Sequence, residues 1–348
     1  MRVFAIFMVM ALHLFGASRG IIVAANNTYA TTLIPSLSIL RQVYQCHLPI
    51  EVWYSGDELS EETQEKIKMV GDVTFCDVAK ILGGDPKEYR GYQIKGYMMG
   101  ATDFDEVVLM DADVFFFQNP EVLFEHPGYL ETGAFLFRDV KWQMFGDPHP
   151  PFRWYHNGKV SIYKERREYI LRHIPTPSSY VPEEWLHYWD LDFVPSNKHP
   201  ISSEQVETGC VIMDRVRHAK AIKNTVAFND DRKTFFRLFL GEKETFWLGL
   251  EMAKEPYYIN PVFPFCYFTD LNHLKKRHDL VHFVDGELVF LQKTPEFPPI
   301  KPFLVNNQIE RHPAVLKNIE NYGTIPTNRE IEEFRDLTFY YHLFTKAL

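Results

Sequence analysis

The sequence has fewer basic than acidic residues, and it has few cysteines. Its 348 residues carry 37 Lys and Arg against 46 Asp and Glu, a formal net charge of −9. Binding nucleic acid through a general basic field needs the opposite balance, so we expect no nucleic-acid partner. The four cysteines are too widely spaced for a zinc knuckle, and they can be free thiols or form up to two disulfides in an oxidising compartment. They are Cys46, Cys76, Cys210 and Cys266.

The sequence also lacks internal repeats, low-complexity linkers and any apolar run of full membrane-spanning length. The N-terminal run from Val3 to Leu12 falls short of the roughly 20 residues that a spanning helix needs. An arginine before it and small residues after it are typical of a signal peptide, although an extension through Phe15 would also suit an uncleaved anchor. We therefore expect residues 1–19 to be a signal peptide or short membrane anchor that leads into the secretory pathway. Residues 20–348 then form a single domain.

What the sequence does contain is an alternation of apolar runs and helix-like segments. The apolar runs are "GIIVAA", "LPIEVWYSG" and "VTFCDV". Between them stand "TLIPSLSILRQVY", where Pro35 suits only a first helical turn, and "EETQEKIKMV", for which Ser60 is a good N-cap. The alternation predicts an α/β fold with a mainly parallel sheet. Ligands bind at the carboxyl ends of such strands, so the turn from Ala24 to Thr31 should border the site.

Residues 140–200 lose this periodicity and are rich in proline and aromatic side chains. Long irregular stretches in a compact domain are usually functional or poorly ordered. We interpret this one as an insertion that faces the substrate, with a helix in "YKERREYILRHI". The sheet pattern resumes in "VETGCVIMDR", and a capping box at Thr327 and Glu330 predicts a C-terminal helix.

Two aspartates, Asp111 and Asp113, lie inside the apolar run "VVLMDADVFFF". A buried carboxylate is costly unless it finds a partner, a metal or a proton. Because residues i and i+2 of a strand point to the same side, we expect one extended strand to deliver both carboxylates to one spot. Hard oxygen ligands of this kind hold Mn²⁺ or Mg²⁺ against a diphosphate.

A phosphatase of the dehalogenase type also places Asp-x-Asp after an apolar strand. There the first aspartate is a nucleophile and the second an acid or base. In that class the motif normally opens the chain, whereas here it begins at Asp111, and no later acidic motif completes the set. The metal interpretation is therefore preferred.

The segment from "RGYQIKGY" through "MDADVFFFQNP" to "ETGAFLFRD" resembles the core of the fungal Golgi α-mannosyltransferase family, glycosyltransferase family 71. It is preceded by "GIIVAANNTYATTLIPSLSILRQVYQCHLPIEVWYSGDE" and followed by "ETGCVIMDRVRH", "GEKETFWLGLEMA" and "LVHFVDGELVFL". All stand in the family's order, so the resemblance runs from Gly20 to about Lys293. It implies a GT-A-type, Rossmann-like fold in which a mainly parallel central sheet is flanked by helices in one catalytic domain. It also implies a metal-dependent, retaining transfer of a hexose from a nucleotide-sugar, GDP-mannose in the best-known members, to an oligosaccharide or glycoprotein in the Golgi or ER lumen.

The resemblance also implies roles for single residues. Asp111 and Asp113 would hold Mn²⁺ (or Mg²⁺) against the diphosphate, with His282 as a third ligand. Glu207 would contact the donor sugar, and Glu244, preferred over Glu242, would hold the acceptor hydroxyl or steady positive charge at the anomeric carbon. No protein nucleophile is named, since a front-face mechanism needs none. The residues expected to contact the nucleotide-sugar are Asn26, Tyr29, Arg90, Lys95, Asp111, Thr208 and Gly209, with Arg90 and Lys95 one strand upstream of the aspartates.

Two departures from the fungal pattern bear on the substrates. The long stem that normally follows the membrane anchor is missing, and the 140–200 insertion matches nothing in the family pattern. A UDP-sugar donor therefore remains an alternative to GDP-mannose. A catalytically inactive glycan-binding protein of the same fold is a second alternative, from a different functional class.

Overall fold

The computed structural model describes six segments of the chain, residues 18–139, 160–193, 206–239, 241–268, 278–292 and 328–346. The predicted signal peptide or anchor lies outside them except for its last two residues, and so does Thr327 of the predicted capping box. No helix within these segments is long and apolar enough to cross a bilayer.

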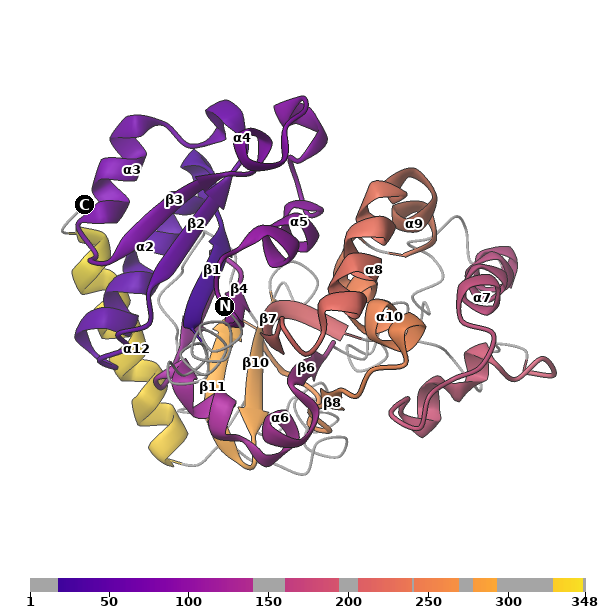
Figure 1. Ribbon diagram of the computed structural model, residues 1–348. Coiled ribbons are helices and arrows are strands. Elements are labelled where there is room, and N and C mark those ends of the chain that lie inside the picture. Colours follow the sequence, from indigo (N-terminus) through magenta and orange to yellow (C-terminus); the bar gives the residue numbers. More distant parts are fainter. Residues whose placement is uncertain are drawn as a thin grey trace, which may run out of the picture.

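A seven-stranded sheet forms the centre of the molecule (Figure 1). Its strands run in the order β3-β2-β1-β4-β7-β6-β8, and every neighbouring pair is parallel except the two that β7 makes. The strands are β1 Arg19–Ala24, β2 Ile50–Tyr54, β3 Val73–Asp77, β4 Glu106–Met110, β6 Ala134–Arg138, β7 Val206–Asp214 and β8 Tyr258–Ile259. The expected α/β fold with a mainly parallel central sheet is confirmed, and β7 is the strand that runs the other way.

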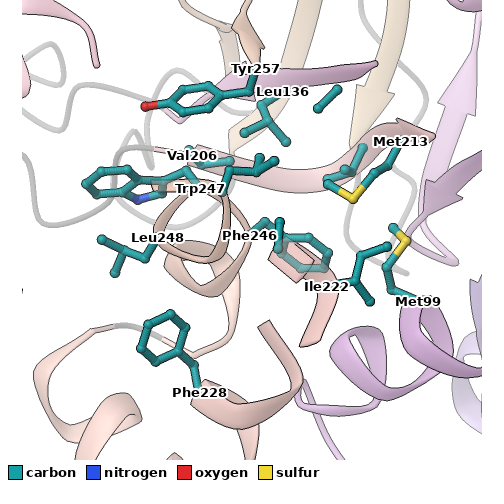
Figure 2. Packing of buried hydrophobic residues seen from close by; sticks show 14 of the residues in the cluster. Met99, Leu136, Val206, Met213, Ile222, Phe228, Phe246, Trp247, Leu248 and Tyr257 are labelled. Atoms are coloured by element: carbon teal, nitrogen blue, oxygen red, sulfur yellow. The ribbon is translucent and has the colours of Figure 1, made fainter. Parts of the chain in front are cut away.

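Helices cover both faces of this sheet (Figure 1). The helices are α2 Asn27–Gln42, α3 Glu61–Lys68, α4 Val78–Leu82, α5 Ile94–Ala101, α6 Pro127–Thr132, α7 Val160–His173, α8 Ala219–Asp230, α9 Arg232–Leu238, α10 Lys243–Ala253 and α12 Asn328–Lys346. Successive residues of a strand point to opposite faces, so Ile21 packs with α2 whereas Ile22 packs in the core that α5, α8 and α10 share. Figure 2 shows part of this second core, where Phe246 of α10 lies near Ile222 of α8 and Met213 of β7.

A second, antiparallel sheet lies beside the first and changes the interpretation of the two aspartates. Its order is β5-β11-β10-β9, with bounds β5 Val114–Phe116, β9 Phe265–Phe268, β10 His278–Val284 and β11 Glu287–Gln292. The run "VVLMDADVFFF" is therefore not one strand: β4 ends at Met110 in the first sheet and β5 begins at Val114 in the second. The prediction of a single strand was wrong, because the chain passes from one sheet to the other at Asp111–Asp113.

The segment after β1 also differs from the prediction. Asn26 caps α2 by accepting hydrogen bonds from the backbone N–H groups of Thr28 and Tyr29, so the helix begins at Asn27 and most of the expected turn is helical. Pro35 consequently lies in the interior of α2 rather than in its first turn. The predicted cap at Ser60 is confirmed, since its hydroxyl accepts from the backbone N–H of Thr63.

The described part of the insertion, residues 160–193, contains α7 and the 3₁₀ helix η6 Glu183–Tyr188. The helix predicted in this segment is confirmed as α7. Arg138 of β6 forms an ion pair with Glu184 of η6, and Ser178 donates its backbone N–H to Glu251 of α10 over 2.9 Å. These two contacts help to fasten the segment to the core.

Candidate functional site

A cavity of about 530 Å³ opens at the carboxyl ends of β1 and β4, a volume typical of small-molecule sites. Its position confirms that the turn after β1 and the two aspartates lie along one crevice. The residues that line it are Ala24, Ala25, Asn26, Tyr29, Glu58, Gly91, Tyr92, Ile94, Lys95, Asp111, Ala112, Asp113, Gly241, Glu242, Lys243 and Gln292.

Asp111 is held on both carboxylate oxygens. Its Oδ1 lies 2.5 Å from the ammonium of Lys95, and its Oδ2 accepts a hydrogen bond of 3.1 Å from the amide of Gln292 on β11. Lys95 also pairs with Glu242 Oε1 at 2.9 Å. Burial alone would lower the pKa of Lys95, but the two carboxylates raise it above its ordinary value, so the lysine stays charged. Lys95 lies on α5, the helix that precedes β4.

Asp113 has the opposite environment. Within the described segments its carboxylate has no ion-pair partner, although it lines the cavity beside Asp111. Burial raises its pKa well above the ordinary value, and the negative charge of Asp111 acts in the same direction. A positive charge placed between these two carboxylates would relieve both effects.

His282 lies on β10 and is completely buried. Its ring stacks on Phe290 with centroids 4.2 Å apart and meets Phe137 edge-on at 5.3 Å, and neither ring nitrogen has a hydrogen-bond partner among the described residues. Burial lowers its pKa to about 3, with Glu207 opposing that shift, so the imidazole is neutral. Neutral imidazole with unpaired nitrogens is the form that can ligate a metal.

The donor set at the aspartates fits a divalent cation. Asp113 is a carboxylate without an ion-pair partner in the described segments, and a hard cation takes its remaining ligands from phosphate and water. The described residues contain no group of three His, Cys, Asp or Glu side chains close enough to hold a metal together. The structure thus brings Asp111 and Asp113 to the cavity without assembling the three-ligand set, and the ligand role of His282 stays a prediction.

A second lysine, Lys243, lines the cavity at the start of α10. Its ammonium lies 2.6 Å from Glu207 Oε2 and 2.9 Å from Asp139 Oδ2. Burial alone would raise the pKa of Glu207, but the charge and hydrogen bond of Lys243 hold it below its ordinary value. Glu207 itself is fully buried, and its other oxygen accepts from the backbone N–H of Gly209. It therefore contacts the lysine rather than the cavity.

Thr208 and Gly209 lie on β7, behind the residues that line the cavity. The hydroxyl of Thr208 donates to Glu242 over 3.0 Å, and its carbonyl accepts from Lys95 over 3.3 Å. A Cβ at Gly209 would come within 3.1 Å of the Gln292 side chain, so the glycine leaves room for the amide that holds Asp111. Neither residue is among those that line the cavity.

The two glutamates at the start of α10 face different surroundings. Glu242 lines the cavity and pairs with Lys95. Glu244 is buried outside the lining, and its carboxylate accepts a hydrogen bond from the indole of Trp247. The catalytic role predicted for Glu244 stays a prediction, and of the two glutamates only Glu242 is among the residues that line the cavity.

Asn26, Tyr29 and Arg90 were predicted to contact the nucleotide. Asn26 and Tyr29 do line the cavity, although the side-chain oxygen of Asn26 is occupied as the cap of α2. Arg90 lies behind the wall, where it is bonded to Asp57 and has its Nε 3.9 Å from Glu58.

Several lining residues were not singled out from the sequence, namely Glu58, Tyr92, Lys243 and Gln292. Gln292 is 181 residues from Asp111, and pairing between β11 and β5 brings it there. No local sequence pattern predicts a contact between residues so far apart in the chain. Tyr92 and Lys243, by contrast, lie within "RGYQIKGY" and "GEKETF", two of the segments that carry the family resemblance.

Comparisons with known proteins show which proteins this chain resembles. A family described as "Mannosyltransferase putative" matches residues 18–270. The "Putative alpha-1,3-mannosyltransferase MNN12" of Candida albicans is 26% identical over 282 residues, 70% of this chain and 31% of the relative. The "Alpha-1,3-mannosyltransferase MNT3" of Saccharomyces cerevisiae is 27% identical over 229 residues, 62% of this chain and 35% of the relative. The chain thus spans about a third of the length of these curated relatives.

Solved structures give weaker similarity. The mannosyltransferase Ktr4p from S. cerevisiae matches with a TM-score of 0.45 and 11% identity, over 91% of this chain and 84% of that one. Core-mannan synthase A from Aspergillus fumigatus, in its Mn/GDP form, matches with a TM-score of 0.44 and 12% identity, over 71% and 72%.

Proposed function

The chain belongs to the family described as "Mannosyltransferase putative", and from that premise we propose that it transfers mannose from GDP-mannose to a glycan acceptor. The reaction is metal-dependent and retains the anomeric configuration. The catalytic domain comprises residues 20–348, with 140–200 as an acceptor-facing insertion. Residues 1–19 direct the chain to the Golgi or ER lumen as a signal peptide or anchor. The observation that carries the proposal is the pair Asp111 and Asp113 at the cavity, where Asp113 forms no ion pair within the described segments.

Asp111 and Asp113 would hold Mn²⁺ (or Mg²⁺) with the donor diphosphate. A divalent cation bound there neutralises negative charge that develops on the departing nucleotide. To accept it, Asp111 must share or exchange its contact with Lys95, which retains Glu242 as a partner.

Lys243 would add a fixed positive charge at the same wall. Asp139 and Glu207 hold its ammonium from behind, so the charge is preorganised and needs no rearrangement when the bond to the diphosphate breaks. Glu207 acts in this proposal as a positioning residue. Glu242, rather than Glu244, faces the sugar and the acceptor hydroxyl.

The test is calorimetric titration of the full chain with GDP-mannose and a panel of UDP-sugars, each with and without Mn²⁺. We expect binding of GDP-mannose that requires the metal, followed by transfer of an α-linked mannose to an α-mannoside acceptor. Binding of a UDP-sugar instead would correct the donor. A folded protein that binds glycans but no donor would be a lectin-like relative, and capture of fluoroaluminate with phosphate release would indicate the phosphatase.

A further inference from the structure

The cavity has two chemically different ends. Asp111 and Asp113 stand at the end of β4, whereas Glu58 lines the wall beyond β2. The strand order β2-β1-β4 separates these ends by two strand spacings, about 10 Å. A nucleotide with its diphosphate at the aspartates would therefore extend its base toward Glu58. This step rests on the proposed function.

Glu58 is a carboxylate that still has acceptor capacity. It ends the 3₁₀ helix η1 Gly56–Glu58, and its side chain is 22% exposed. Arg90 lies 3.9 Å from Glu58 Oε1, beyond hydrogen-bonding distance, because its terminal nitrogen is bonded to Asp57. Burial raises the pKa of Glu58, and Arg90 opposes that shift. A desolvated carboxylate on a cavity wall is satisfied by N–H donors from a ligand.

Two exposed tyrosines stand on the same cavity. Tyr29 lies in the first turn of α2 and is 41% exposed, and Tyr92 lies in the loop before α5 and is 66% exposed. Gly241, with φ of +70°, lies beside the ring of Tyr92, since a Cβ there would contact the ring at 3.6 Å. Exposed aromatic rings at a nucleotide cavity can stack against the base, whichever base it is.

We propose that Glu58 selects guanine as the base of the donor, while Tyr29 and Tyr92 stack against the ring. Guanine carries two adjacent donors, N1–H and the exocyclic 2-amino group, and a carboxylate accepts both at once. Uracil offers one N–H between two carbonyl oxygens, which a carboxylate repels. Arg90 acts in this scheme as a positioning residue for Glu58 and does not contact the phosphates.

The experiment measures binding of GDP, IDP and UDP to the full chain in the presence of Mn²⁺. IDP lacks only the 2-amino group, so the ratio of its affinity to that of GDP isolates one hydrogen bond. We expect GDP to bind about tenfold tighter than IDP, and UDP to bind more weakly than either. Glu58→Gln should bring the GDP-to-IDP ratio close to one and improve UDP relative to GDP.

Two further variants separate base selection from stacking and from folding. Glu62→Gln makes the same chemical change on an 82% exposed side chain of α3 and should keep the wild-type ratio. Tyr92→Ala should weaken GDP and IDP alike, by about 5- to 100-fold, without changing their ratio. Equal, Mn²⁺-dependent binding of GDP and IDP by the wild type would overturn the role of Glu58 and leave the proposed function standing. No binding of any nucleotide with Mn²⁺ would overturn both.

Discussion

At the scale of single residues, Asp113 is the strongest indication that the cavity binds a cation. Four other carboxylates surround the same region, on Asp111, Asp139, Glu207 and Glu242, and they face two ammonium groups, those of Lys95 and Lys243. Each lysine already bridges two of these four acids. Asp113 forms no ion pair within the described segments, and burial, with the negative charge of Asp111 acting in the same direction, raises its pKa.

Asp113→Ala should abolish Mn²⁺-dependent binding of GDP-mannose, by more than about 100-fold, because it removes a direct metal ligand. The melting temperature should stay the same or rise, since the substitution relieves repulsion with Asp111. Calorimetry and thermal melts measure the two effects. Asp103→Ala, an exposed acid shortly before β4, is the matched control and should bind normally. Normal donor binding by Asp113→Ala would remove it from the metal site.

Glu242 and Glu244 can be separated by the same conservative change. Glu242→Gln removes the charge that shares Lys95 with Asp111, so turnover should fall tenfold or more. Glu244→Gln keeps an acceptor for the Trp247 indole, so turnover should stay within about twofold while the melting temperature falls. Steady-state kinetics on acceptor transfer measure both. Loss of turnover in Glu244→Gln alone would restore Glu244 as the catalytic acid.

At the scale of elements, the described part of the insertion is an aromatic unit seated on the core. Trp185 of η6 packs against Trp247 of α10 with centroids 5.0 Å apart, and Tyr163 of α7 bonds the carbonyl of His187 over 2.8 Å. Arg166 of α7 donates to the carbonyl of Leu238 on α9 over 2.9 Å. His187 packs among these aromatic rings in its neutral form. The packing should therefore weaken when acid protonates the imidazole.

The 160–193 segment should loosen as the pH falls. Burial lowers the pKa of His187 to about 4 from an ordinary 6.5, with Arg166 adding to the shift. The unfolded histidine therefore binds a proton first, and stability that is complete above pH 6.5 is lost as the pH falls to about 4. The loss amounts to at most about 3 kcal/mol.

Hydrogen exchange of this segment between pH 4 and 7 measures the effect. His187→Gln should abolish most of the pH dependence, whereas His47→Gln, on an exposed residue outside the segment, should leave it intact. A segment equally protected at pH 4.5 and pH 7 in the wild type would contradict the prediction.

At the scale of the whole molecule, the site depends on two sheets meeting. Asp111 belongs to neither β4 nor β5; its backbone N–H donates to the carbonyl of Gly209 on β7 over 2.9 Å, and its side chain is held by Gln292 on β11. The first sheet thus fixes the backbone of Asp111 and the second fixes its carboxylate. Metal and donor binding should accordingly be sensitive to the junction of the sheets as well as to the aspartates themselves.

The sequence by itself determined the fold class, the family and the location of the cavity. Apolar runs that alternate with helix-spaced segments leave few arrangements other than an α/β sheet, and ligands of such sheets gather at the carboxyl ends of the strands. The resemblance to fungal α-mannosyltransferases is confirmed by the family match over residues 18–270. The helix cap at Ser60 was also predicted from the sequence, because a cap involves only neighbouring residues.

Only the tertiary structure decided which side chains face the cavity. Spacing in sequence could not tell Glu242 from Glu244, because the choice depends on where the start of α10 meets Lys95 and Trp247. It could not place Gln292 beside Asp111, and it suggested one strand where the chain changes sheets. Periodicity reports which residues are buried, whereas long-range strand pairing decides what each buried or half-buried group touches.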